Sequence, residues 1–456
     1  MKNIILNTDS YKTSHFLQYP PKSEFVSSYI EARNDDDKSC IFFGLQAFIK
    51  EYLLTPFTQK DLDEANDIIT AHGLIFNYND WKYILDKYDG YLPLEISAVK
   101  EGSKIPLKCP LVQVINTDKK LPWLTSYIET ALLRAIWYPS TVATISYEVK
   151  QIIKEFLDKT SNDTNSELEF KLHDFGARGV SSNESSILGG MAHLLNFKGT
   201  DTLSCIVGAK RYYNAEMAGF SIPASEHSTI TSWQKNGEEE AYSNMIDKFA
   251  KKGSMFAVVS DSYDIYNAIS NIWGKNLKEK VLNSGATLIV RPDSGNPKEM
   301  VLEVIQRLYK SFGGYINTKG YIVLNDAIRV IQGDGVDKYS IKEILSTLEK
   351  EGFSASNIAF GMGGALLQQP NRDTLSFAMK ASAIKVDGVW KDVYKDPITD
   401  SKKRSKKGRL ALLEDFTTIK LDELNNRINL LEIVYKDGIL VREENFDEIR
   451  EKINER

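Results

Sequence analysis

The sequence predicts an α/β protein with an irregular βα barrel and a second domain. From about residue 170, short apolar runs end in polar or glycine-rich loops, each followed by a helical pattern. The later strand ends lie about 30 to 40 residues apart, which is room for one strand, one loop and one helix. Seven such units in sequence favour a barrel over an open sheet. A chain of 456 residues also exceeds the size at which one core stops growing.

The N-terminal part of the chain mixes helical and extended patterns. Ser126 and Glu129 have the spacing of a capping box, and apolar residues continue on one face as far as Pro139. This pattern predicts a helix that ends at the proline. Residues 142–157 repeat apolar side chains every three or four positions, which predicts another helix.

The domain boundaries follow from changes in composition. The polar segment 161–167 is rich in turn formers and predicts a linker. We therefore expect the barrel domain at 161–379, with residues 1–160 and 380–456 outside it. Near the C-terminus, the basic segment 395–409 has the pattern of a solvated loop. It is followed by a predicted hairpin that turns at Asp437-Gly438 and by a final helix.

The seven strand-and-loop units of the predicted barrel share an apolar start and an abrupt polar end. They are KLHDFGARG (171–179), NFKGTDT (196–202), SIPASEHST (221–229), VVSDSYD (258–264), LIVRPDSGNP (288–297), RVIQGDGVD (329–337) and IAFGMGG (358–364).

Composition excludes several classes of protein. A net charge of −5 argues against nucleic acid or an anionic membrane as the main partner. No apolar run approaches the ~18 residues of a membrane helix, and the N-terminus lacks the apolar core of a signal peptide. The three cysteines are far apart and outside any CxxC spacing, so neither a disulfide framework nor a zinc site is expected. These features predict a soluble, cytoplasmic protein with buried thiols.

Loops at the carboxyl ends of barrel strands converge on one mouth. If the loops converge, their polar residues line one shared pocket. The alternative is that these residues are polar only because loops generally are. The members of the shared pocket would be Asp174, Arg178, Asp201, His227, Asp261, Arg291, Asp293, Asp334 and Gly363.

Two consecutive glycine loops, IQGDGVD and FGMGG, predict phosphate binding, because such loops present backbone N–H groups at a helix start. Asp293 and Asp334 would repel a bare phosphate unless they accept ribose hydroxyls or hold Mg²⁺, which favours a phosphorylated sugar. Arg178, Arg291 and the segment 395–409 could neutralise a pyrophosphate, and structural ion pairing is the alternative for each arginine.

Here the residues carry a resemblance to a known family. The segments NTDSYKTSHFLQYPP, KLHDFGARGVSS, NFKGTDT, IPASEHSTIT, SDSYDIYN, RPDSGNP, VIQGDGVD, FGMGGALLQ and KRSKKGRL resemble, in this order, those of the nicotinamide phosphoribosyltransferases, a type II phosphoribosyltransferase family. The match covers essentially the whole chain. It implies an irregular βα barrel and a second α+β domain built from both chain ends, 1–160 plus 380–456. It also implies a head-to-tail homodimer that makes nicotinamide mononucleotide and pyrophosphate from nicotinamide and phosphoribosyl pyrophosphate for NAD salvage, with Mg²⁺ and optional ATP hydrolysis.

The resemblance also implies roles for particular residues. His227 matches the histidine that ATP phosphorylates, and Asp261 matches the carboxylate beside it. His227, Asp261, Arg291 and Asp293 form the implied catalytic set. Phe175, Asp201, Arg291 and, from the second subunit, Tyr11 would bind nicotinamide. Gly333, Asp334, Gly363, Gly364, Arg372 and Lys380 match ribose and phosphate positions, and Arg178, Arg33, Lys395 and Lys403 would serve the pyrophosphate. The resemblance identifies no metal ligands, and the other four histidines are read as structural or surface residues.

Two departures and two alternatives accompany this interpretation. Ala257 and Ala177 replace polar residues of animal relatives, which predicts a less polar base pocket. A nicotinate (or other pyridine) phosphoribosyltransferase is one alternative, and an inactive binding protein on the same fold is the other. An aspartate at position 201 favours an amide, because a carboxylate accepts from an amide N–H and repels the carboxylate of nicotinate.

Overall fold

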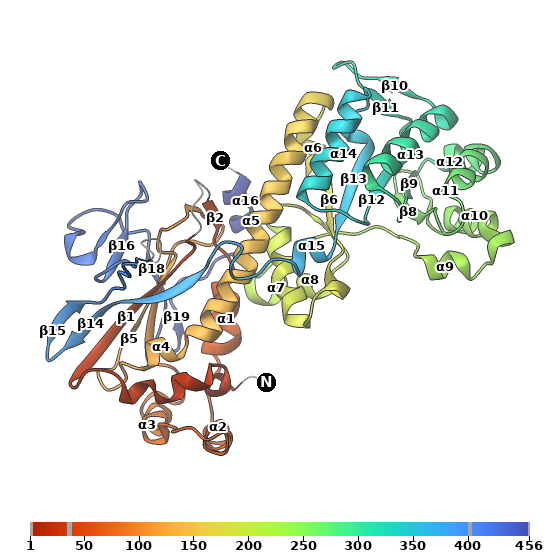
Figure 1. The fold of residues 1–456 in the computed structure, drawn as a ribbon. Coiled ribbons are helices and arrows are strands. Elements are labelled where there is room, and N and C mark those ends of the chain that lie inside the picture. Colours follow the sequence, from red (N-terminus) through yellow and green to blue (C-terminus); the bar gives the residue numbers. More distant parts are fainter. Residues whose placement is uncertain (1–2, 34–38, 400–403, 455–456) are drawn as a thin grey trace. The chain divides into compact units, whose positions relative to one another are not determined.

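A computed structural model describes residues 3–33, 39–399 and 404–454 (Figure 1). The chain forms two compact units, of which the first comprises 1–144, 209–215 and 371–456 and the second comprises 145–208 and 216–370. The expected two-domain α/β organisation is thus confirmed, with one unit assembled from both chain ends. The first division falls inside a long helix, whereas the predicted boundary at residue 160 falls at the end of that helix.

The first unit is built on a sheet whose seven strands, among the described residues, come from both ends of the chain. Its spatial order is β15 (Val389–Asp392), β14 (Ala378–Val386), β1 (Ser23–Glu31), β5 (Val112–Asn116), β3 (Leu94–Ala98), β18 (Glu432–Lys436) and β19 (Ile439–Leu440). All neighbouring pairs are antiparallel. Strand β1 therefore lies between strands from opposite ends of the chain, and its register places Tyr29 opposite Lys380 of β14.

The longer helices of the first unit bury an apolar face, as helix α2 (Gln59–Ala71) illustrates. This helix begins with a capping box in which Thr58 and Asp61 satisfy each other's backbone N–H, and it buries Leu62, Ala65 and Ile69. The other helices of this unit are α1 (Leu45–Phe48), α3 (Tyr78–Tyr88), α4 (Leu124–Tyr127) and α16 (Phe446–Asn454), together with the N-terminal half of α5 (Glu129–Thr160).

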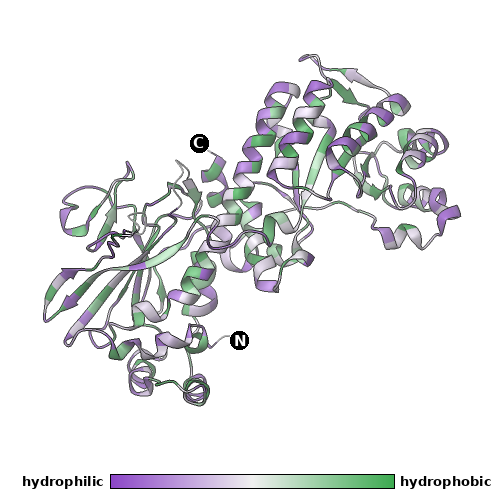
Figure 2. Cartoon of the chain, in the orientation of Figure 1, coloured by the Kyte–Doolittle hydropathy of each residue, from purple (hydrophilic) through white to green (hydrophobic). Residues whose placement is uncertain are grey.

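The second unit contains the parallel sheet. Its order is β7 (Gly199–Thr200), β6 (Leu172–Asp174), β13 (Ile358–Met362), β12 (Ile328–Gln332), β9 (Thr287–Arg291) and β8 (Met255–Val259), with every pair parallel. Most of these strand residues are buried, as expected for a parallel sheet covered by helices. Figure 2 shows the strands mainly in green and the covering helices with purple outer stretches.

The two edges of this sheet are joined by segment 220–225. Parallel bridges link Gly199 of β7 to Phe220 and Ala224 to Ala257 of β8. Backbone hydrogen bonds support both bridges, from Thr200 N to Phe220 O at 3.0 Å and from Ser225 N to Ala257 O at 3.0 Å. The segment forms only isolated bridges and no regular strand, yet it closes the ring of strands between β7 and β8. All seven predicted units therefore supply one barrel position each, and the irregular barrel is confirmed.

Helices separate the barrel strands, as the spacing predicts. In chain order they are α6 (Thr164–Leu168), α7 (Asn183–Leu194), α8 (Leu203–Tyr213), α9 (His227–Thr231), α10 (Glu238–Phe249), α11 (Ile265–Asn267), α12 (Lys278–Ser284), α13 (Pro297–Phe312), α14 (Lys338–Lys350) and α15 (Gly364–Leu367). A small antiparallel pair, β10 (Gly314–Ile316) and β11 (Ile322–Leu324), lies between α13 and β12 in the chain.

Two expectations about the long helix are wrong. Helix α5 runs through Pro139 without ending, and nearby hydroxyls bind carbonyls of the same turns, from Thr141 Oγ1 to Trp137 O at 2.6 Å and from Thr144 Oγ1 to Ser140 O at 2.7 Å. The capping box is also absent from this described segment, because Ser126 Oγ donates to Trp123 O and Glu129 pairs with Lys12 at 2.7 Å. The tertiary partner of Glu129 outweighs its local capping preference.

The remaining expectations about the ends of the chain can be checked directly. The hairpin β18–β19 turns at Asp437-Gly438, where both residues have positive φ, and α16 follows, so this prediction is confirmed. Within the predicted linker 161–167, residues from 164 form the short helix α6 instead. All three cysteines are free and buried, as expected. In the described part of the chain, no helix combines the length and apolar character needed to cross a membrane.

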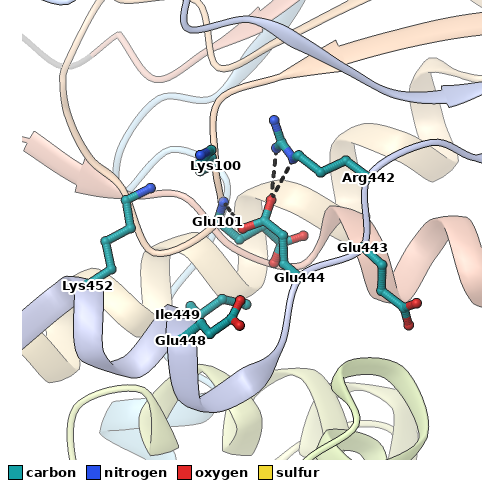
Figure 3. Close-up of a pocket in the computed structure, with 8 residues that line it drawn as sticks. All are labelled: Lys100, Glu101, Arg442, Glu443, Glu444, Glu448, Ile449 and Lys452. Carbon is teal, nitrogen blue, oxygen red and sulfur yellow. Dashed lines mark hydrogen bonds and ion pairs between the residues drawn. The ribbon is translucent and has the colours of Figure 1, made fainter.

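A buried carboxylate pair ties the C-terminal segment into the first unit. Glu101 accepts hydrogen bonds from Gly44 N at 2.9 Å, Gln46 N at 2.7 Å and Tyr213 OH at 2.8 Å. Its own backbone N–H donates to Glu444, which also binds Arg442 (Figure 3). Burial and the negative charge of Glu444 raise the pKa of Glu101 to about 7. A cavity of about 200 Å³ beside this pair is lined by Lys100, Glu101, Arg442, Glu443, Glu444, Glu448, Ile449 and Lys452.

This pair predicts a pH dependence of stability. Because the folded-state pKa of Glu101 lies above its ordinary value of 4.5, the folded state binds a proton more tightly, and stability falls as pH rises from about 4.5 to about 7. Glu444→Gln removes the neighbouring charge and should lower that pKa. We expect the loss of unfolding free energy between pH 5 and pH 8, measured in urea, to shrink by on the order of 1 kcal/mol. An unchanged loss in the variant would contradict this account.

Candidate active site

The parallel order of the second unit places the carboxyl ends of all seven barrel positions at one end. The residues predicted to converge therefore follow neighbouring strands. Asp174 ends β6 and Asp201 follows β7; His227 follows segment 220–225; Asp261 follows β8 and Arg291 ends β9; Gly333 follows β12 and Gly363 follows β13.

His227 begins helix α9, with Glu226 as the N-cap residue. Its Nε2 lies 3.4 Å from Asp293 Oδ2 and 3.7 Å from Asp261 Oδ1. Its Nδ1 lies 3.0 Å from the hydroxyl of Ser262. The imidazole side chain is 47% exposed, so it is held by three side chains yet is open to a ligand. Two carboxylates at Nε2 favour a proton on that nitrogen, which leaves Nδ1 as the acceptor.

Asp261 anchors the loop opposite the histidine. Its Oδ2 accepts from the backbone N of Asp293 at 2.9 Å and from Ser294 Oγ at 2.5 Å. Its Oδ1 is buried and has no hydrogen-bond partner among the described residues. That oxygen faces Nε2 of His227 at 3.7 Å. An unsatisfied buried carboxylate oxygen is costly, so this atom is suited to accept a hydrogen bond or to bind a cation.

Arg291 connects the carboxylates to an aromatic ring. Its Nε and Nη2 donate to Asp293 Oδ1 at 3.1 Å and 2.7 Å, and its guanidinium carbon lies 5.7 Å from the centre of the Phe175 ring. Asp293 is thus shared between Arg291 and His227. The structure brings the four residues of the implied catalytic set together, with Phe175 beside them.

Asp174 lies at the centre of the two loops that carry Phe175 and Asp201. It is fully buried, and its carboxylate accepts from Gly176 N at 2.7 Å and from Thr200 Oγ1 at 3.2 Å. Its backbone O accepts from Asp201 N at 3.0 Å. Burial raises the pKa of this carboxyl. Asp174 therefore holds the two loops from inside the fold. The prediction that it lines the pocket at the barrel mouth is wrong, because its side chain is fully buried.

Asp201 is exposed and bonds to Ser221, whose hydroxyl donates to its Oδ1. The charge of Asp201 also acts on His173, whose pKa is lowered mainly by burial and raised in part by this carboxylate. The His173 ring centre lies 6.2 Å from that of Phe175. His173 therefore lies close to the proposed base-binding residues, and its burial disfavours the charged form of the ring.

The glycine loops follow β12 and β13. Gln332 Nε2 donates to the backbone O of Asp334 at 2.8 Å and shapes the first loop, in which Asp334 is exposed. Gly363 is the N-cap residue of α15, and its backbone lies against the backbone of Phe175, because a Cβ there would be 3.4 Å from Phe175 O. At Gly364, a Cβ would meet nothing within 4 Å. Arg178 is exposed in the short 3₁₀ turn Ala177–Gly179.

The predicted cations of the first unit form a cluster of their own. Lys380 is half-buried, and burial together with the charges of Arg33, Lys395 and Arg372 lowers its pKa, against the opposing charge of Glu129. Arg33, Lys395 and Arg372 therefore act electrostatically on Lys380. Glu129 binds Lys12, whose ammonium lies 5.3 Å from the ring centre of Tyr11. Tyr11 is 60% exposed. Lys403 lies outside the described residues.

The loop that carries Lys395 is fastened to strand β1. Lys395 N donates to Ser405 Oγ at 2.8 Å, and the next residue, Lys406, pairs with the buried carboxylate of Glu31 at 2.7 Å. Lys406 N also donates to Tyr29 OH at 2.8 Å. The described part of the basic segment is therefore not simply a solvated loop, because Lys406 is bound to Glu31 and Tyr29 of strand β1.

Several residues of the barrel mouth escaped the sequence analysis. Ser262 and Ser294 each follow a predicted aspartate directly, and their hydroxyls bind His227 and Asp261. Ser221 binds Asp201, and it opens a predicted unit. Adjacency to a predicted site residue was the available signal for Ser262 and Ser294, whereas Ser221 offered only its place in a predicted unit. Ala257, one of the departures, is a buried residue of β8 whose backbone N donates to Pro223 O at 2.9 Å in the barrel closure.

The described residues contain no group of three or more His, Cys, Asp or Glu side chains arranged to hold a metal ion. Mg²⁺ commonly binds through one or two carboxylates plus substrate phosphates and water. The unpartnered Oδ1 of Asp261 and the adjacent Asp293 fit that pattern.

Comparisons with family models match two regions of the chain. Residues 170–439 match the "Nicotinate phosphoribosyltransferase (NAPRTase) family", and residues 3–96 match "Nicotinamide phosphoribosyltransferase, N-terminal domain". The first match covers more than half of the chain and includes all seven barrel positions.

Relatives of known name extend over the whole chain. The nicotinamide phosphoribosyltransferase of Xanthomonas campestris is 50% identical, over 99% of this chain and 98% of its own length. That of Acinetobacter baylyi is 32% identical, over 98% of this chain and 96% of its own length. Among solved structures, nicotinate-nucleotide pyrophosphorylase from Pyrococcus furiosus has a TM-score of 0.63 at 16% identity, with 99% of this chain and 95% of that chain covered. Human nicotinic acid phosphoribosyltransferase has a TM-score of 0.59 at 14% identity, with 98% and 93% covered. These two structures share the fold.

Proposed function

The chain belongs to the nicotinamide phosphoribosyltransferase family, and we propose that the barrel mouth joins nicotinamide to the ribose of phosphoribosyl pyrophosphate in NAD salvage. The pyridine nitrogen forms a bond to ribose C1 while the bond from C1 to the pyrophosphate oxygen breaks. The pyridine nitrogen is already nucleophilic, so no general base is required. Catalysis then depends on alignment of the two substrates and on stabilisation of the departing charge.

The observation that carries the proposal is the placement of Arg291. Its guanidinium lies over Phe175 and binds Asp293, which also faces His227. A ring stacked on Phe175 would therefore lie next to a cation and to the carboxylates suited to a sugar phosphate. The aromatic face suits a flat ring that becomes cationic when its nitrogen is alkylated. Asp201 would accept the carboxamide N–H beside this ring.

We further propose that ATP phosphorylates His227 on Nδ1. Asp293 and Asp261 lie at Nε2, so they keep the proton there, and the Nδ1 lone pair is free to attack once Ser262 moves aside. Nδ1 bonds to the γ-phosphorus, the bond to the bridging oxygen breaks, and ADP leaves. Water later cleaves the phosphorus–nitrogen bond. The two carboxylates stabilise the positive charge that the ring gains.

The barrel mouth is also suited to Mg²⁺, which would bind there together with the pyrophosphate group of phosphoribosyl pyrophosphate. Asp261 and Asp293 would hold it, since one has an unpartnered buried oxygen and the other lies next to it. When bound, Mg²⁺ neutralises charge on the pyrophosphate. In the first unit, the charges of Arg33, Lys395 and Arg372 act on Lys380, and such a concentration of positive charge favours an anion.

Nicotinate transfer is the competing activity, and an inactive binding protein is the other alternative. With equal concentrations of the two bases and excess phosphoribosyl pyrophosphate, we expect nicotinamide mononucleotide to form in large excess over the nicotinate product, measured by liquid chromatography. A dominant nicotinate product would replace the substrate assignment. Formation of neither product by folded protein would favour the binding protein.

We propose a homodimer as the working form, with Tyr11 contributed to the partner's base site. Exposed apolar side chains of the second unit support an interface: Leu203 and Val207, one turn apart on α8, are 81% and 66% exposed. Phe170 and Phe220 are also exposed and contact each other, with ring centres 6.3 Å apart. Exposed apolar groups of this size are typical of association surfaces.

The dimer proposal predicts a linked loss of assembly and activity. The double substitution Leu203→Glu and Val207→Glu places charges on the exposed face of α8, so it should give monomers in light scattering and at least a tenfold lower turnover. Lys248→Glu, an exposed position on the separate helix α10, is the charge-reversal control and should leave the dimer intact. Monomers with full activity would contradict a shared site, and an intact dimer would place the interface elsewhere.

A further inference from the structure

The ring of Phe175 fits against a strand residue that has no side chain. Gly361 lies in β13, directly opposite His173 in the parallel register with β6. A Cβ built on Gly361 would lie 1.9 Å and 2.1 Å from two ring carbons of Phe175. These distances are far inside van der Waals contact, so the ring occupies the volume that any other residue at 361 would need.

Backbone conformation does not explain this glycine. Gly361 is in a regular strand and is not among the glycines with positive φ. Alanine could adopt the same backbone, and β-strands in general disfavour glycine. The close approach of the Phe175 ring is therefore the feature of the structure that requires glycine at this position.

Two further groups enclose the ring. Gly333, at the end of the neighbouring strand β12, would place a Cβ 3.2 Å from the ring, and the Arg291 guanidinium lies 5.7 Å from its centre. The Phe175 backbone is fixed as well, because its N–H donates to Met362 O at 3.1 Å. The ring thus has little freedom to retreat, and a methyl group at 361 would push it into the barrel mouth.

We propose that Gly361 is a positioning residue that sets how deeply the Phe175 ring sits, and hence the width of the slot for a flat aromatic base. This inference rests on the proposed function, in which Phe175 stacks on nicotinamide. Gly361 itself does not contact the base. Gly333 acts in the same way to a smaller degree, because a Cβ at this position would be only slightly too close to the Phe175 ring, at 3.2 Å.

The test is a double-mutant cycle on the KM values of the two substrates. Gly361→Ala should raise the KM for nicotinamide at least tenfold and change the KM for phosphoribosyl pyrophosphate less than twofold. Gly333→Ala should raise the nicotinamide KM by a smaller factor. With Phe175→Ala already present, adding Gly361→Ala should change the nicotinamide KM less than twofold, because the ring that it displaces is gone.

Several outcomes would overturn the proposal. An unchanged nicotinamide KM in Gly361→Ala, equal rises in both KM values, or a full additional effect in the Phe175→Ala background would each show that residue 361 does not act through the ring. If Gly361→Ala fails to fold, the graded effect of Gly333→Ala and its loss in the Phe175→Ala background decide the same question. A parent protein without nicotinamide-dependent turnover would instead refute the proposed function.

Discussion

His227→Ala should abolish the stimulation of mononucleotide formation by ATP and leave a basal transfer activity. The imidazole is the group held between two carboxylates and the Ser262 hydroxyl, so its removal takes away the phosphoryl acceptor. Arg291 and Phe175 keep their own partners in the variant, because neither depends on the imidazole. Transfer without ATP should therefore persist at a measurable rate. Initial rates with and without ATP, at saturating nicotinamide, give the comparison.

His72→Ala is the matched control, since His72 is exposed in the first unit and contacts the Ser10 hydroxyl at 3.1 Å. That variant should keep the full ATP response. Incubation with ATP labelled in the γ-phosphate should label the parent protein and the His72 variant, but not the His227 variant. Equal ATP stimulation in His227→Ala would reject the phosphohistidine assignment, and label that persists in this variant would place the acceptor elsewhere.

Asp201→Asn should weaken the discrimination between nicotinamide and nicotinate by at least about tenfold, because the site loses its negative charge and gains an amide donor. The carboxylate of Asp201 accepts from a carboxamide but repels a carboxylate. An amide in its place would accept nicotinamide less well and would no longer repel nicotinate. The ratio of kcat/KM for the two bases is the measured quantity.

Asp247→Asn is a suitable control, because Asp247 is an exposed residue that pairs with Lys280 on the surface of the same unit. It should leave the ratio unchanged. Ser221→Ala tests the support of Asp201, since the Ser221 hydroxyl donates to that carboxylate. We expect a smaller shift in the same direction. An unchanged ratio in Asp201→Asn would mean that another group reads the amide.

The barrel could be predicted because each unit repeats the same local signal, an apolar strand that ends in a polar loop. This holds even for segment 220–225, which forms only isolated bridges with its neighbours. Local signals failed where a distant partner decides the structure. Pro139 remains inside α5, and Glu129 pairs with Lys12 rather than with the start of its own helix.

The candidate site was less accessible to sequence reasoning than the fold. Parallel strand order explains why His227, Asp261 and Asp293 meet, and this much follows from strand ends alone. The sequence does not indicate that one ring nitrogen faces two carboxylates. It also does not show that the His173 side chain is buried close to the Phe175 ring, or that Gly361 is a glycine because a ring occupies its side-chain volume. Such features depend on side-chain depth inside the barrel, which no local pattern encodes.

The most direct test of the account is a mass balance of nicotinamide mononucleotide and pyrophosphate for the purified protein, with nicotinamide, phosphoribosyl pyrophosphate and Mg²⁺, with and without ATP. We predict equal amounts of the two products in both conditions and a higher yield with ATP. Consumption of phosphoribosyl pyrophosphate by folded protein without nicotinamide mononucleotide, or no product at any enzyme concentration, would contradict the assignment of the barrel mouth as the site of this transfer.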